Sequence, residues 1–399
     1  MRKIIITGGG FHNKGAESMT FIAVDEMHKR FPNHEIYVIC DSEYELAKNN
    51  EKMFKFKIKQ FDNVIPVLRR KNLKHFLYYL IKGYDKSDAK RTNDFFSRVD
   101  ILLDISGYAL GSDWQQCVIE NYLYKIDCAN YFGIKVYLMP QSFGPFNYNS
   151  GEKKKVFNRI KKSLKNAEVI CAREQEGYDI LTDEIGLTNV IKSYDLVLNN
   201  KSLDLNNVYN VIPEFNIPEI EKNSVAIIPN AMTISNDGRN KDKILNLYKE
   251  IISELLNRGK NIYIIYHAGM DRDFCRQIYE LCSNEKIYFL DNDYNCIEFN
   301  SLVKKFDFII ASRFHAVVHS YKNSVPCITL GWAIKYRELH KAVKQDQYVF
   351  NIRDDFNGKN ILNSIDNMLA NYKKESDIIK NALAQIQKNN VFDIIELER

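Results

Sequence analysis

A short basic run late in the chain has the composition of an anion-binding site. Arg313 and His315, separated by Phe314, follow the apolar stretch 308–311, and a helical period begins with them. The first turn of a helix carries unpaired N–H groups and the positive end of the helix dipole, so an anion is stabilised there. A charged imidazole at the same place is disfavoured unless an anion compensates it. These residues therefore indicate a binding site, and we expect Ser312 to cap the helix.

A second basic residue, Arg173, stands at the exit of another predicted buried strand, 169–172. Its planar guanidinium offers paired N–H donors that match a phosphate or a carboxylate. The alternative is a salt bridge to Glu174 or Glu176 at the start of the next helix. The first interpretation places an anion near Arg173, and the second gives it a structural role.

Further polar side chains follow other predicted strands. Asn13 ends a glycine-rich turn, where it either caps the following helix or contacts a substrate. Gln141 and Ser142 stand in a loop stiffened by prolines, and they either point into a cleft or complete a structural turn. His267 is a candidate ligand contact or a helix cap. His319, one helical turn after the basic run, either joins the site or only packs and orients.

The sequence lacks the motifs of common cofactor and metal sites. The glycines at 8–10 and 15 do not have the spacing of a dinucleotide fingerprint. No HExxH, Walker lysine loop or GxSxG elbow occurs in the chain. We therefore expect neither a metal ion nor a cofactor.

Two series of short apolar strands and amphipathic helices position these residues. One series runs from a strand at 4–7 to a helix at 174–181, and the other from a strand at 225–228 to a strand at 327–330. This alternation predicts an α/β protein with two Rossmann-like parallel sheets. Ligands of such sheets lie beyond the carboxyl ends of the strands, so we expect the polar residues to face a cleft between two domains.

The predicted domain limits follow from a break in this alternation. Residues 199–223 are rich in asparagine and contain two prolines, which indicates a linker. We expect an N-terminal domain over 1–205, a C-terminal domain over 206–355 and C-terminal helices over 356–399. The basic and aromatic segment 49–91 is predicted as a variable insertion with one helix near 73–84.

Length and composition narrow the class of protein. The chain has 399 residues, 45% hydrophobic and 27% charged, which is typical of a folded globular protein. No apolar run is long enough to span a bilayer. A net charge of +5 is too mild to indicate nucleic-acid binding, and it suits anionic substrates. The eight cysteines form no CxxC pair, so we expect free thiols and a cytoplasmic protein. The lysine-rich helix predicted at 152–165 is either a solvated face or a peripheral contact with an anionic membrane.

Taken in order, the motifs resemble those of the polysaccharide pyruvyl transferase family. The resemblance rests on Asn13-Lys14-Gly15-Ala16-Glu17, Gln141-Ser142-Phe143-Gly144-Pro145, Ala172-Arg173-Glu174, Ser312-Arg313-Phe314-His315-Ala316 and Val325-Pro326. It covers roughly residues 4–332. The chain departs from the family pattern at Ala16, where an acid is usual, and at residues 106–108, where three glycines are common.

The resemblance implies a glycosyltransferase-B-like pair of domains and transfer of a pyruvyl group from phosphoenolpyruvate to a sugar hydroxyl pair, forming a ketal. It implies that the C-terminal domain is the donor side and that the donor is bound by Arg173 of the N-terminal domain together with Arg313, Phe314, His315 and Ser312. Catalysis would fall to His315, Arg313 and Arg173. The N-terminal domain would bind a sugar or lipid-linked saccharide acceptor, for which the candidates are Asn13, Glu17, Gln141, Ser142 and His267.

Two other functional classes are compatible with the same residues. A glycosyltransferase using a nucleotide sugar would also hold phosphates with Arg and His at helix starts. A binding or regulatory protein could keep the fold without catalysis. A nucleic-acid binder is disfavoured, because basic and aromatic residues do not cluster as in known modules. The sequence predicts neither the acceptor sugar nor the oligomeric state.

Overall fold

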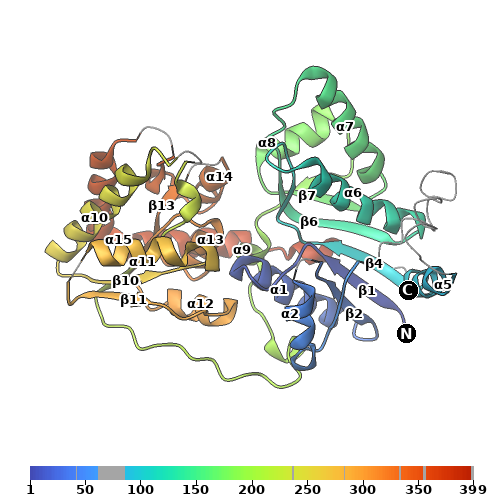
Figure 1. Cartoon of the computed structure of the whole chain (residues 1–399), viewed down its shortest axis with the longest axis horizontal. Coiled ribbons are helices and arrows are strands. Elements are labelled where there is room, and N and C mark those ends of the chain that lie inside the picture. Colours follow the sequence, from blue (N-terminus) through green and yellow to red (C-terminus); the bar gives the residue numbers. More distant parts are fainter. Residues whose placement is uncertain are drawn as a thin grey trace.

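The computed structural model describes residues 1–41, 43–61, 86–235, 238–282, 284–331, 334–353 and 356–396. Its strands form two parallel sheets, each flanked by helices, and the two α/β units lie side by side (Figure 1). The predicted fold class is thus confirmed. The helix predicted near 73–84 lies outside the described residues.

The first sheet has the strand order β3-β2-β1-β4-β6-β7-β8, with parallel neighbours throughout. The inner strand β1 is buried along its whole length, because helices cover both faces of the sheet. The short strand β5 pairs with the end of β6. The strands are β1 (Lys3–Thr7), β2 (Glu35–Ile39), β3 (Lys57–Lys59), β4 (Val99–Asp104), β5 (Tyr108–Leu110), β6 (Lys135–Phe143), β7 (Val169–Ala172) and β8 (Val190–Lys192).

Helices of the first unit follow most of these strands. The long helix α1 packs on β1 and β2 and also on α12 and α13 of the second unit, so it is buried on nearly every side. That double packing makes α1 the main element of the junction. The helices are α1 (Lys14–Arg30), α2 (Tyr44–Asn49), α5 (Lys86–Phe96), α6 (Gln116–Tyr131), α7 (Ser150–Leu164), α8 (Gln175–Asp179) and α9 (Leu196–Asn199).

The second sheet has the order β11-β10-β9-β12-β13-β14 and is also parallel. Its strands are β9 (Ser224–Ile228), β10 (Asn261–Ile265), β11 (Ile287–Leu290), β12 (Phe308–Ala311), β13 (Cys327–Gly331) and β14 (Val349–Asn351). The helices are α10 (Lys241–Asn257), α11 (Arg272–Leu281), α12 (Cys296–Val303), α13 (Phe314–Lys322) and α14 (Ile334–Ala342).

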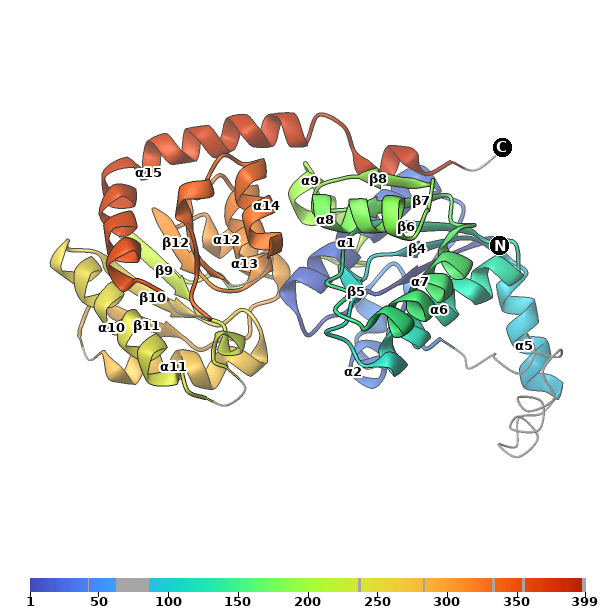
Figure 2. The same cartoon turned by 90° about the horizontal axis from the view of Figure 1, so that it is seen from above.

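A long C-terminal helix, α15 (Gly358–Ile386), crosses from the second unit back to the first (Figure 2). At its end, Asn199 donates to the carbonyls of Ile386 and Asn389, at 2.9 and 3.0 Å, and accepts from the N–H of Val391. The tail ends against the first sheet, where the Tyr137 hydroxyl contacts Glu396. The chain therefore joins the two units twice, through the segment 200–223 and through α15.

Two sequence predictions differ from the observed elements. The segment 49–91, predicted as a variable insertion, contains β3, which pairs in parallel with β2 and belongs to the sheet. Short edge strands such as β3, β8 and β14 and the helix α14 were not predicted, because their apolar periods span too few residues. The predicted domain limits at 205 and 355 stay predictions.

Among the described residues, no helix is long and apolar enough to cross a membrane. The eight cysteines are free, and most are buried. Helix α7 buries Ile160 and Leu164 and turns most of its lysines outward. The membrane contact of this helix stays a prediction.

Candidate functional site

Residues from the carboxyl ends of both sheets line one pocket of about 240 Å³ between the two units. We call it the arginine pocket. The first unit contributes residues that follow β1, β4 and β7, and the second contributes residues that follow β9, β10, β12 and β13. Its walls include Asn13, Ser106, Gly107, Tyr108, Arg173, Asn230, His267, Arg313, Phe314, His315 and Lys335. Three cationic side chains meet there, and no aspartate or glutamate of the described chain is part of the wall.

His315 sits in the first turn of α13, as the sequence predicts, and it faces the other unit. A Cβ added at Gly15 would lie 2.1 Å from its Cγ, far inside van der Waals contact. Position 15 must therefore be glycine for helix α1 to approach the imidazole this closely. Burial lowers the pKa of His315 to about 4, and the carboxylate of Asp195 opposes that shift.

Arg173, at the end of β7, is held in place by several contacts at once. Its guanidinium donates to Asp195 at 2.5 Å, to the Gly107 carbonyl at 2.9 Å and to the Ser142 hydroxyl at 2.7 Å. It also lies over the Phe314 ring, 4.8 Å from the centroid. This last contact brings a residue of the first unit directly onto the helix start that carries Arg313 and His315.

Asp195 links the two predicted groups, although the sequence analysis did not identify it. One carboxylate oxygen caps helix α9 by accepting from the Val197 N–H, and the other accepts from Arg173. The second oxygen also lies 3.7 Å from Nε2 of His315. Burial alone would raise the pKa of Asp195, but His315 and Arg173 hold it below its ordinary value. Asp195 is therefore ionised, and it orients the guanidinium of Arg173 while lying beside the imidazole of His315.

Arg313 forms a two-pronged ion pair with Asp271, which is fully buried. The Nε and Nη2 atoms donate to the two carboxylate oxygens at 2.7 and 2.6 Å. Asp271 also accepts from the Ala231 N–H. The pairing fixes the guanidinium plane at the pocket wall.

Lys335, near the start of α14, supplies a third positive charge. Its ammonium lies 5.3 Å from the centroid of the Phe314 ring and 5.9 Å from that of Tyr108. Burial lowers its pKa to about 8, and repulsion by Arg173 and Arg313 acts in the same direction. Within the described ranges it forms no ion pair with a carboxylate, unlike the two arginines. A bound anion would supply the missing partner.

His267 lines the same pocket and is completely buried. In the part of the chain that the structure describes, neither of its ring nitrogens has a hydrogen-bond partner. Burial lowers its pKa well below the ordinary value, with the positive charge of Lys14 as the next cause. A neutral imidazole with a free donor and a free acceptor is suited to contact a bound hydroxyl.

Asn13 and Phe314, both predicted as binding residues, line the arginine pocket and also make contacts that stabilise the fold. Asn13 caps α1 by accepting the Gly15 N–H at 2.9 Å, and it also lines the pocket. Phe314 contributes its ring, while its backbone makes a hydrogen bond with Tyr336. The donor contact that the resemblance implies for Phe314 stays a prediction.

The structure places the other predicted residues behind the wall. Glu17 accepts the N–H of Cys296 at the start of α12, at 2.7 Å, and so ties the two units together. Gln141 is buried between Asp104 and Tyr122, and Ser142 supports Arg173 and Glu174. The prediction that Ser312 caps α13 is wrong, because its hydroxyl bonds to Tyr248 at 2.8 Å and the capping position is Arg313.

The site residues that the sequence analysis did not identify have one feature in common, which is that each follows a strand of a parallel sheet. Asp195 comes soon after β8, Asp271 after β10 and Lys335 after β13. The rule that found Arg173 would have found Asp195 if the three-residue strand β8 had been recognised. Among the described residues, no cluster of His, Cys, Asp and Glu could hold a metal ion.

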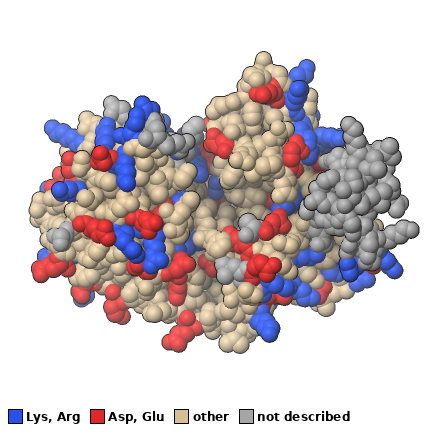
Figure 3. Space-filling model, in the orientation of Figure 1, with Lys and Arg blue, Asp and Glu red and all other residues tan. Residues whose placement is uncertain are grey.

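The space around the arginine pocket extends beyond it. An adjoining cavity of about 420 Å³ shares Arg173, Phe314 and Lys335 with it and leads along α14. Figure 3 shows a hollow between the two units, with positive and negative side chains mixed over this face of the molecule. Chemically, the arrangement can hold a small polyanion between two oriented guanidinium groups and an ammonium, beside two neutral imidazoles.

Solved structures of low sequence identity share the fold. A protein described as a UDP-N-acetylglucosamine 2-epimerase of Listeria monocytogenes superposes with a TM-score of 0.58 at 12% identity, covering 98% of this chain and 93% of that one. The Anabaena protein HepE in complex with UDP and glucose gives 0.55 at 9% identity, covering 99% and 97%. A glycosyltransferase of Rickettsia africae gives 0.53 at 14% identity, covering 98% and 95%. These likenesses establish the two-domain fold of glycosyltransferase-B type.

At the level of sequence, no curated protein matches the chain. The sequence model of one family does, over residues 13–333, which include the segments around Arg173 and His315. That match spans most of the chain and confirms the resemblance drawn from the ordered motifs. The chain belongs to the polysaccharide pyruvyl transferase family and is a transferase.

Proposed function

We propose that this transferase takes phosphoenolpyruvate as donor and attaches its pyruvyl group to two hydroxyls of a saccharide as a ketal. The observation that carries the proposal is the arginine pocket itself, where Arg173, Arg313 and Lys335 surround a space lined by no carboxylate of the described chain. Phosphoenolpyruvate carries a phosphate and a carboxylate on a three-carbon frame. Two oriented guanidinium groups and one ammonium complement these two anionic groups.

The balance of charge in the pocket supports a multiply charged donor. Asp195 and Asp271 pair with the two arginines, and they also fix the orientation of both guanidinium planes. Lys335 has no carboxylate at ion-pair distance among the described residues. A donor that brings about three negative charges gains from all three cations, because charge-assisted hydrogen bonds contribute about 1.5–3 kcal/mol each.

His315 is the group we assign to proton transfer. Burial lowers its pKa to about 4, so the imidazole is neutral at pH 7. The negative charge of the donor nearby favours the protonated ring, which then lies between the donor and the carboxylate of Asp195. In the proposed reaction, this proton goes to the methylene carbon of the donor while a sugar hydroxyl adds to C2 and gives its own proton back to the imidazole. The C2–O bond to phosphate then breaks, the second hydroxyl closes the ketal at C2, and its proton leaves with the phosphate.

The acceptor would enter from the first unit and the adjoining cavity. His267 and Asn13 line the arginine pocket and can contact sugar hydroxyls, whereas Glu17, Gln141 and Ser142 act through packing. Tyr108 and the half-exposed Trp114 lie near the entrance, with ring centroids 5.7 Å apart. Aromatic faces of this kind commonly pack against sugar rings.

Replacing the loop 108–114 by a loop of different sequence tests whether Tyr108 and Trp114 contact the acceptor. A change in acceptor preference would support this assignment.

One incubation tests the donor. Purified protein is mixed with phosphoenolpyruvate and a panel of saccharides, free, nucleotide-activated and lipid-linked, and the products are read by mass together with released phosphate. Gain of the pyruvyl unit with equal release of phosphate supports the proposal. The alternative is transfer from a nucleotide sugar, which the UDP-bound neighbour makes worth including as a parallel arm. Release of nucleoside diphosphate without use of phosphoenolpyruvate would overturn the proposal.

A further inference from the structure

A second cationic pocket lies at the same junction and shares no wall residue with the first. It has a volume of about 320 Å³. Its walls come from α1 of the first unit, from the segment after α9, from α12 and α13 of the second unit, and from the end of α15. Every segment that joins the two units thus contributes. We call it the lysine pocket, after Lys201, Lys304 and Lys322.

The charged side chains in the wall of the lysine pocket are all positive. No aspartate or glutamate in the described part of the chain is among its wall residues. The Lys322 ammonium donates to Oδ1 of Asn200 at 3.1 Å, and over the described ranges none of the three lysines pairs with a carboxylate. Burial lowers the pKa of Lys322 to about 8, Cys296 and Asp195 oppose that shift, and repulsion by Lys304 adds to it. An ammonium that is largely withdrawn from water and has no carboxylate in direct contact is stabilised when an anion joins it.

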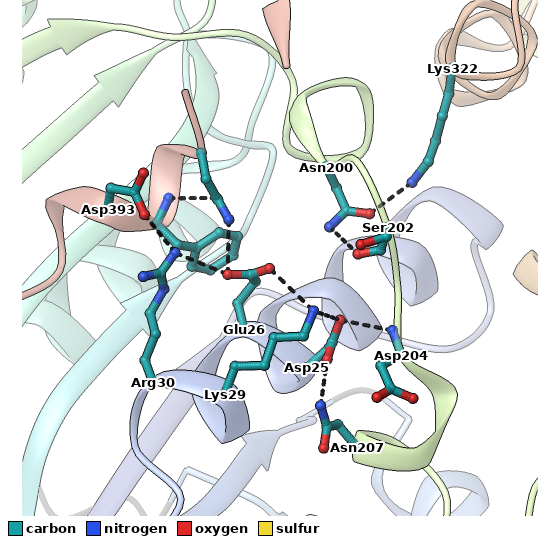
Figure 4. Close-up of polar contacts among 12 residues, drawn as sticks. Asp25, Glu26, Lys29, Arg30, Asn200, Ser202, Asp204, Asn207, Lys322 and Asp393 are labelled. Atoms are coloured by element: carbon teal, nitrogen blue, oxygen red, sulfur yellow. Dashed lines mark hydrogen bonds and ion pairs between the residues drawn. The ribbon is translucent and has the colours of Figure 1, made fainter. Parts of the chain in front are cut away.

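Carboxylates on the nearby helix α1 are committed elsewhere (Figure 4). Asp25 accepts from Lys29 at 2.7 Å, from Asn207 at 2.8 Å and from a backbone N–H at 3.0 Å. Glu26 pairs with Arg30 at 3.1 Å and accepts from Asn390 at 3.0 Å. In the same view Lys322 extends from α13 to Asn200, on the other side of the segment 200–202. The lysine charges are therefore left for a ligand.

The polar wall is fixed by its own hydrogen bonds. Oδ1 of Asn300 accepts from Asn323 at 2.8 Å and faces Nδ1 of His319 at 3.2 Å, while Nε2 of His319 faces the Ser18 hydroxyl at 3.1 Å. Because Asn300 uses its oxygen for both contacts, its amide nitrogen remains a donor. Ile22, Leu203 and Ile297 complete the wall with apolar surface. The pocket thus offers an anion-binding end and a surface for an uncharged body.

We propose that the lysine pocket binds a phosphorylated small molecule, with its phosphate at Lys304 and Lys322 and its body against the apolar wall. The volume suits a molecule of the size of a sugar phosphate. The ligand would touch both units at once, and it would therefore couple occupancy of this pocket to their relative position. The proposal is independent of the reaction assigned to the arginine pocket.

Binding of glucose 1-phosphate, measured by calorimetry at pH 7, tests the proposal. The background is an Arg313→Gln variant, which disables the arginine pocket, with Lys335→Met as a second background if the first does not fold. We expect one binding site in either background. Lys322→Met should weaken binding about tenfold or more, Lys304→Ser several-fold, and the exposed Lys380→Met on α15 should leave it unchanged. Unphosphorylated glucose should not bind.

The outcomes separate cleanly. Lys322→Met removes an ammonium that pairs with no carboxylate in the described ranges and loses one hydrogen bond to Asn200. Its melting temperature should therefore stay close to that of the parent, and a loss of binding at an unchanged melting temperature is not due to unfolding. Absence of glucose 1-phosphate binding, equal binding of glucose, or full binding by the Lys304→Ser/Lys322→Met double variant would each overturn the proposal. None of these results depends on whether phosphoenolpyruvate is a substrate.

Discussion

The two cationic pockets of the junction hold their charges in opposite ways. In the arginine pocket, each guanidinium is locked by a buried carboxylate, Arg173 by Asp195 and Arg313 by Asp271. In the lysine pocket, flexible ammonium groups stand without such partners in the described structure. This difference shows that the orientation of a cationic side chain and the net charge of a pocket are separate requirements for function. Chemistry needs fixed donor planes, whereas simple anion binding needs net charge.

The largest expected effect is a loss of turnover from a substitution in the arginine pocket that leaves the lysine pocket unchanged. His315→Gln removes the group assigned to proton transfer, so turnover should fall by about 10²–10⁴. Glucose 1-phosphate should bind to the lysine pocket of this variant as before. His12→Gln, at an exposed position of the turn before α1, serves as the control and should keep its activity. Steady-state kinetics check the prediction, and a turnover within threefold of the parent would contradict it.

The next effect tests the contact between the units. In Gly15→Ala the new Cβ would fall 2.1 Å from the His315 Cγ, so helix α1 or the imidazole must move. We expect a loss of about 1–3 kcal/mol in the free energy of unfolding, together with lower kcat/KM. Gly269→Ala is the matched control, since nothing lies within 4 Å of a Cβ there. Equal stability of the two variants would show that the contact is not tight.

A third prediction concerns Lys335, which lies in the arginine pocket but, like the lysines of the lysine pocket, has no carboxylate partner among the described residues. Lys335→Met should raise KM for the donor about tenfold while kcat changes little, because one charge-assisted contact is lost. Its stability should not fall, since no buried partner is left behind. Arg173→Gln should instead cost about 3–5 kcal/mol of stability, because it leaves Asp195 buried and unpaired. Equal melting temperatures of the two variants would contradict this distinction.

The smallest expected effect is the pH dependence of stability that comes from His315, His319 and Glu17. Burial lowers the pKa of His315 to about 4 and that of His319 to about 3, from an ordinary value of 6.5. Their contribution to stability is complete above pH 6.5 and is lost as the pH falls towards 4, because the unfolded chain binds these protons first. Burial raises the pKa of Glu17 to about 7, so its charge destabilises the fold above pH 7. This cost disappears as the pH falls from 7 towards 4.5.

Glu17→Gln should therefore be more stable than the parent at pH 8, and the advantage should shrink by pH 5. Urea unfolding at pH 8, 6.5 and 5 measures both trends. Because Glu17 contacts α12 and not the arginine pocket, the variant should keep its KM for the acceptor within about twofold. A large rise in that KM would restore the acceptor role that the sequence predicted for Glu17.

Much of the fold followed from local patterns. The apolar runs of β1, β7, β9 and β12 and the long period of α10 are strong signals, because each element buries a complete face. The strand β8 has three residues, of which only Val190 is buried, so no period could identify it. Its omission hid Asp195, the residue that joins the two halves of the candidate site.

The sequence by itself determined which residues follow buried strands, and hence that Arg173, Arg313 and His315 lie at the carboxyl ends of two parallel sheets. Only the tertiary structure decided which of these side chains share a pocket and which face inward, as Glu17 and Gln141 do. The reason is physical. Strand and helix periods depend on neighbours within a few residues, whereas the partner of a charged group depends on how two separately folded sheets pack against each other.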